Sequence, residues 1–168
     1  MELHHIDPYV QSQLYKLASS ELCSGVVGQL MTSLMVRPPQ PGGESYELFQ
    51  QENNAIFDGL KERSQKLVEG LNSIPGISCA PAEGAMYAFP KVEIPEKAIE
   101  AAQEQGTTPD NLYALSLLEH TGICVVPASG FGQKKGRVGF RTTFLHPDTV
   151  KAVDLFRQHH ELFVKEYS

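Results

Sequence analysis

The stretch RVGFRTTFL at residues 137–145 is the clearest β-strand in this sequence and decides how its second half folds. Arg141 lies in the middle of this apolar strand, where a guanidinium loses hydration and needs an anionic partner. Its planar fork suits bidentate binding of a small carboxylate substrate. The 20 acidic side chains of the chain offer an alternative, an internal ion pair. The residues alone leave both interpretations open.

Shorter strands are predicted on either side of this stretch, at residues 77–80, 85–89 and 123–126, the last of them buried. A helix capped by Asp110 and ended by Gly122 precedes the strand at 123–126. His146-Pro147-Asp148 opens a final helix, whose inward face is expected to hold Val150, Val153, Phe156, Leu162 and Phe163. This order predicts an α+β fold, with a small and mostly antiparallel sheet covered on one face by helices.

The first part of the chain is helical and separable from the rest. Asp7-Pro8 predicts a helix start, and apolar residues recur at helical spacing from Val10 onward, with a break at Ser24-Gly25. The proline- and glycine-rich stretch 37–43 is the best boundary, so we predict units at 1–36 and 37–168, with a long helix over 45–73. The first unit is apolar on much of its surface and is expected to need a partner.

Composition narrows the classes of function. The net charge of −6 argues against a nucleic-acid partner, and the apolar runs are far shorter than the roughly 20 residues of a membrane span, so no membrane partner is expected. The six histidines form no His-Glu-x-x-His pattern, and no metal site is predicted. The three cysteines are expected to be reduced core thiols.

Two loops invite an anion-binding interpretation. Residues 128–133 (ASGFGQ) resemble a phosphate loop only weakly, since no Gly-Lys-Ser/Thr follows, and a plain backbone turn explains them as well. Ser24 lies in a helix break and could meet an anion, or could simply cap the next helix.

Several segments together resemble one family. They are LCS at 22–24 with GQ at 28–29, MV at 35–36 with PP at 38–39 and PG at 41–42, EGAMYAFP at 83–90, Pro95 with KAIEAA at 97–102, VPASGFGQ at 126–133, and RTT at 141–143. In this order and without large gaps they are similar to alanine aminotransferases, pyridoxal-phosphate enzymes of fold type I. The resemblance covers nearly the whole chain, and only the carboxy-terminal part of such an enzyme.

The resemblance implies the following roles. Residues 1–36 would be the helical tail of the large, cofactor-binding domain, and 37–168 the small C-terminal domain. Arg141 matches the arginine that binds the substrate α-carboxylate, and Ser24 the position that reaches the cofactor phosphate of the neighbouring subunit. No catalytic residue is expected in this chain, because the Schiff-base lysine would lie upstream, in a large domain that the chain lacks. Met1 is therefore expected to be an internal residue of the full-length enzyme.

The parent enzyme is expected to be a homodimeric, cytoplasmic or mitochondrial transferase of amino-acid metabolism that converts L-alanine and 2-oxoglutarate to pyruvate and L-glutamate. The isolated chain is expected to be inactive. Two other interpretations remain: a fragment of a related glutamate–glyoxylate aminotransferase, and a binding or dimerisation module without catalysis.

Overall fold

The computed structural model describes residues 3–20, 23–134 and 136–168. The chain divides into two compact units, Met1–Glu52 and Asn53–Ser168, and each is described by itself. The division falls inside one long helix, α3 (Tyr46–Asn72), close to the span predicted for it. The predicted domain boundary at 36/37 stays a prediction.

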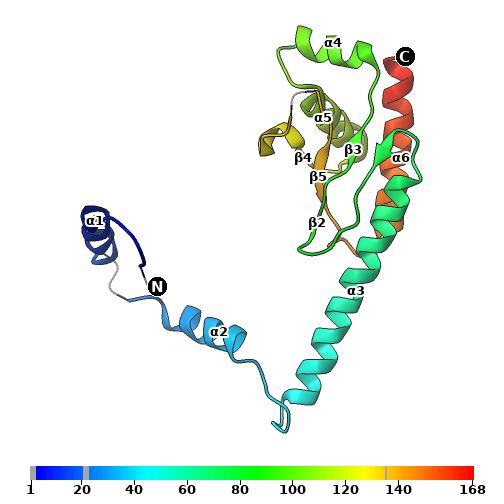
Figure 1. The fold of residues 1–168 in the computed structure, drawn as a ribbon. Helices are drawn as coiled ribbons and strands as arrows, with labels where there is room; N and C mark the ends of the chain where they lie inside the picture. Colours follow the sequence, from blue (N-terminus) through cyan, green and yellow to red (C-terminus); the bar gives the residue numbers. More distant parts are fainter. Residues whose placement is uncertain (1–2, 21–22, 135) are drawn as a thin grey trace. The chain divides into compact units, whose positions relative to one another are not determined.

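The first unit holds helices α1 (Pro8–Ala18) and α2 (Val26–Val36) and the start of α3 (Figure 1). Asp7 caps α1 as predicted, because its carboxylate accepts the N–H groups of Tyr9 and Val10 at 2.9 and 3.3 Å. Helix α2 begins at Val26, directly after the predicted break at Ser24-Gly25. It has no buried residue, and Met31 and Met35 are 57% and 81% exposed, so this helix keeps its apolar surface open within the unit.

The second unit combines helices with short antiparallel strands. Its helices after α3 are α4 (Glu96–Glu104), α5 (Pro109–Thr121) and α6 (Thr149–Glu166), with a 3-10 turn η1 (Ala128–Phe131). Gly122 ends α5 with φ of 76°, a left-handed conformation that glycine adopts at little cost. Asp148 caps α6 by accepting the Lys151 N–H at 3.0 Å. Figure 1 shows α5 and α6 side by side next to the strands.

The strands form two small antiparallel sheets. Strand β1 (Ile77–Ser78) pairs with β3 (Lys91–Val92), and β5 (Phe140–Thr143) lies between β2 (Tyr87–Ala88) and β4 (Val126–Pro127). A bridge between Lys91 and Gly139 links the two sheets. The predicted α+β fold with a mostly antiparallel sheet is therefore confirmed.

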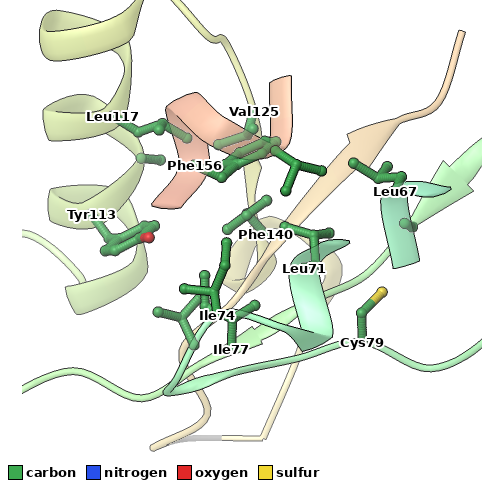
Figure 2. Close-up of a cluster of buried hydrophobic side chains, with 14 of the residues drawn as sticks. Leu67, Leu71, Ile74, Ile77, Cys79, Tyr113, Leu117, Val125, Phe140 and Phe156 are labelled. Atoms are coloured by element: carbon green, nitrogen blue, oxygen red, sulfur yellow. The ribbon is translucent and has the colours of Figure 1, made fainter. Parts of the chain in front are cut away.

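The core lies where α3, α5 and α6 meet the strands (Figure 2). Phe140 of β5 stacks on Phe156 of α6 at a centroid distance of 5.5 Å and on Tyr113 of α5 at 6.0 Å. Burial alternates along β5: Phe140 and Thr142 are buried, Arg141 is half-buried and Thr143 is exposed. Since successive side chains of a strand point to opposite faces, Arg141 lies on the face of the sheet turned away from the core.

Four local predictions were wrong. Val150 and Leu162 of α6 are 62% and 57% exposed rather than inward, and the buried polar residues His159 and His160 take their place in the core. The strand predicted at 123–126 is reduced to β4, whose Val126 is exposed. Asp110 does not cap α5, because Thr108 is the N-cap and Asp110 lies in the first turn.

The thiols also differ from the prediction. Cys79 is a buried core thiol as expected, and burial raises its pKa. Cys23 and Cys124 are exposed and free, although Ile123 and Val125, the neighbours of Cys124, pack in the core.

Candidate functional site

Arg141 is the centre of the candidate site. Its guanidinium carbon lies over the ring of Tyr87 at 4.4 Å from the centroid and over the ring of Phe131 at 4.7 Å. Among residues 3–20, 23–134 and 136–168, no carboxylate lies within ion-pair distance of it. The internal ion pair that the sequence left open is therefore not formed in the described part of the chain.

A cavity of about 490 Å³ adjoins this arginine. The cavity is lined by residues from three parts of the second unit: Arg141 and Tyr87 on the sheet, Cys124 after α5, and His146 and Lys151 near the start of α6. A cavity of this size is in the range of small-molecule sites. A half-buried cation that has no anionic partner among the described residues, beside such a cavity, has the chemistry to bind an incoming carboxylate.

The two aromatic rings beside Arg141 come from separate segments. Tyr87 belongs to β2 and is paired with Thr143, so it lies diagonally across from Arg141 on the same face. The segment before it contains Ala85, a non-glycine residue with φ of 58°, and such residues concentrate at functional sites. Sequence reasoning included Tyr87 in the stretch 83–90 that resembles the family, and gave it no catalytic role. It did not find Phe131, although an aromatic residue in a glycine-rich loop was a visible signal.

The loop that carries Phe131 is fixed by Asp110. The Ser129 N–H donates to the Asp110 carboxylate at 2.6 Å, and Gly132 ends the turn with φ of 69°. Burial alone raises the pKa of Asp110, but hydrogen bonds from Thr108 and Ser129 outweigh it and the pKa falls below its usual value. Because the Ser129 amide already has an anionic partner, this loop is a structural turn, as the simpler interpretation of the sequence held.

Ser24, in the first unit, lies beside a separate groove of about 660 Å³ that Gln29, Thr32 and Arg37 also line. Gln29 donates its side-chain amide to the Ser24 hydroxyl at 3.1 Å. Within the described residues no side chain caps α2, so the N–H groups of its first turn remain available beside this groove. The structure does not bring Ser24 and Arg141 into one unit.

Two features are absent from the described residues. No group of three or more His, Cys, Asp or Glu side chains gathers there in an arrangement that could hold a metal ion. None of the helices in that part of the chain combines the length and apolarity of a membrane span.

This fold and sequence define a class of protein. The sequence profile of the aminotransferase class I and II family matches residues 7–153, and the chain belongs to this family. Within it, the chain is similar to a probable mitochondrial alanine aminotransferase of Dictyostelium discoideum, with 52% identity over 145 residues, which cover 86% of the chain and 27% of that protein. It is also similar to alanine aminotransferase 2 of Xenopus laevis, with 47% identity over 100% of the chain and 32% of that protein.

Among solved structures, the chain resembles an alanine aminotransferase from Pyrococcus furiosus, with a TM-score of 0.66 and 27% identity over 94% of the chain and 34% of that protein. The resemblance to alanine aminotransferases that the sequence motifs indicated is thereby confirmed. The chain spans only about a third of the length of these relatives.

Proposed function

We propose that this chain is the carboxy-terminal part of a pyridoxal-phosphate aminotransferase that moves an amino group between L-alanine and 2-oxoglutarate, giving pyruvate and L-glutamate. Its membership of the family and its similarity to alanine aminotransferases support the reaction class. The observation that carries the role of the chain itself is the Arg141 guanidinium, half-buried beside a cavity and without an acidic partner in the described residues.

In this proposal Arg141 binds the α-carboxylate that the amino acid and the 2-oxo acid share. A guanidinium offers two parallel N–H donors in a fixed plane, which match the two oxygens of a carboxylate. The amino acid and the 2-oxo acid would therefore both be held by their α-carboxylate end. That leaves the amino or oxo carbon at a constant distance from the strand.

Ser24 and the start of α2 have donors that fit a phosphate group. A hydroxyl and uncapped backbone N–H groups suit an anion, and the N-terminal end of the helix dipole favours negative charge. We propose that Ser24 donates to the phosphate of pyridoxal phosphate held by the neighbouring subunit of a homodimer. When bound, this cofactor supplies the electron sink that amino transfer needs.

The remaining parts of the proposal concern the parent enzyme. The lysine that holds the cofactor would lie in the large domain, outside these 168 residues, and the chain alone would be inactive. A cytoplasmic or mitochondrial location is proposed for the enzyme, in line with the mitochondrial name of one relative.

Replacing Arg141 in the full-length protein tests the proposal. Arg141→Ala should raise KM for both the amino acid and the 2-oxo acid roughly 10- to 150-fold, because losing a charge-assisted hydrogen bond costs about 1.5–3 kcal/mol. Arg137→Ala is a matched control, since this arginine is exposed and precedes the same strand. Unchanged KM values in Arg141→Ala would remove this residue from the site.

The isolated chain offers a second test. After addition of pyridoxal phosphate it should show neither a lysine-bound chromophore nor transaminase turnover. Turnover by the 168-residue chain alone would contradict the proposal that the catalytic lysine lies elsewhere. Turnover of the full-length protein with glyoxylate in preference to pyruvate would favour the glutamate–glyoxylate alternative.

A further inference from the structure

Two aromatic rings, and no acidic side chain of the described chain, surround the Arg141 guanidinium. Its carbon lies 4.4 Å from the Tyr87 centroid and 4.7 Å from the Phe131 centroid, in each case over the ring. Phe131 is itself held edge-on by Phe89, at a centroid distance of 5.6 Å and an interplanar angle of 82°. The three rings come from the β2 region and from η1, which are far apart in the sequence.

The two rings can stabilise the partly desolvated Arg141 cation without blocking its hydrogen-bond donors. A half-buried cation loses hydration, and an intramolecular carboxylate would offset that loss only by occupying the N–H groups that a substrate needs. An aromatic face attracts the cation through the ring quadrupole, and guanidinium stacks on such faces without using its in-plane donors. The rings can therefore stabilise the charge and restrict the side chain while its N–H edge stays available.

We propose that Tyr87 and Phe131 are positioning residues that hold the Arg141 guanidinium in the orientation that binds the substrate carboxylate. This inference rests on the proposed function of Arg141. It assigns these two residues a role in substrate affinity that acts through Arg141, without contact between either ring and the reacting atoms.

Substitutions in the full-length protein test the inference. Tyr87→Leu and Phe131→Leu should each raise KM for both amino acid and 2-oxo acid roughly three- to tenfold, the range expected for a partly desolvated cation–π contact, with kcat changed less than about twofold. Tyr87→Phe and Phe131→Tyr keep the ring and should raise KM less than the leucine variants do. Phe57→Leu, at a ring on α3 that is 60% exposed, is a matched control for the loss of an aromatic side chain and should also keep wild-type KM.

A double-mutant cycle separates positioning from direct contact. In the Arg141→Ala background, both leucine substitutions should have no further effect on KM, because their action needs the guanidinium. Additive effects in that background would overturn the inference, as would unchanged KM in both leucine variants while Arg141→Ala raises it. Unchanged KM in Arg141→Ala itself would defeat the proposed function, and the inference with it.

Folding is checked in the same variants. Phe131 is 43% exposed and Tyr87 half-buried, so leucine should be accommodated, and far-UV circular dichroism and Tm should match those of the parent protein. Because the two rings lie on different elements, either leucine variant tests the claim if the other proves unstable.

Discussion

Acidification should destabilise the packing of α5 against α6, because His159 is buried there in its neutral form. The side chain is 1% exposed, and its Nε2 lies 3.0 Å from the Ser116 hydroxyl. Its ring packs edge-on against Tyr113 at a centroid distance of 4.8 Å. In the described structure Nδ1 has no hydrogen-bond partner, so a proton added there would stay buried and unpaired.

The size of the effect follows from the pKa. Burial is the largest cause that lowers the pKa of His159, with smaller contributions from His120 and His160, and it falls from 6.5 to about 4. The unfolded chain therefore binds a proton more readily than the folded one between these values. Stability is then fully present above about pH 6.5 and is lost as the pH falls toward 4. Between about pH 7.5 and about pH 5 the loss amounts to roughly 2 kcal/mol. His160, whose pKa burial also lowers, acts in the same direction.

Urea unfolding of the chain at a series of pH values measures this loss. The variant His159→Phe combined with Ser116→Ala removes the titrating group and its hydrogen-bond partner together, and its free energy of unfolding should depend less on pH by about 2 kcal/mol over the same range. Ser116→Ala alone keeps the imidazole and should retain most of the pH dependence. If the double variant shows the same slope as the parent, His159 is not the group responsible and the argument from its burial fails.

Two further predictions concern packing and the loop beside Arg141. Gly70→Ala should lower the free energy of unfolding by about 1–2 kcal/mol in urea titrations, because the new Cβ would lie 2.5 Å from a methyl carbon of the buried Val153. Adding Val153→Ala to this variant should restore the lost stability. The control Gly59→Ala should be neutral or stabilising, because its Cβ would meet only the end of the Arg63 side chain, at 3.4 Å. Asp110→Ala should cost about 1–2 kcal/mol by removing the acceptor of the Ser129 N–H, and Asp110→Asn should cost less in the same titration; equal stability of all three proteins would show that the carboxylate does not hold the loop.

Local signals with a direct geometric cause were readable from the sequence. Asp7 caps α1 as predicted, the final helix begins after His146-Pro147-Asp148 as predicted, and Gly122 adopts the left-handed conformation expected where a helix ends. In each case the residue type and its position in the chain are sufficient, because the partner groups lie within four residues. The α+β class followed from the same kind of evidence.

Features that depend on distant partners were less readable. The helical period suggested that Val150 and Leu162 face inward, but the face that α6 buries is set by α5 and α3, and it includes His159 and His160. A hydropathy pattern cannot anticipate that His159 and His160 are buried, because each forms a hydrogen bond to a residue of another helix, Ser116 and Tyr113 respectively. Likewise, the placement of the Tyr87 and Phe131 rings beside the Arg141 guanidinium needs the registers of β2 and β4 against β5, which the sequence does not specify.

The surroundings of Arg141 also show why the sequence left its role open. An arginine in an apolar strand carries a positive charge that has lost hydration and needs a stabilising partner. Either a substrate carboxylate or an internal carboxylate would stabilise it. Within the described residues no internal carboxylate pairs with Arg141; aromatic faces stabilise the cation and leave its hydrogen-bond donors uncommitted. Such a site can bind a carboxylate without competition, because an incoming anion does not have to displace an internal ion-pair partner of the guanidinium. The same reasoning explains why removal of a ring should weaken binding without abolishing it: the charge remains, and only the energy of its orientation is lost.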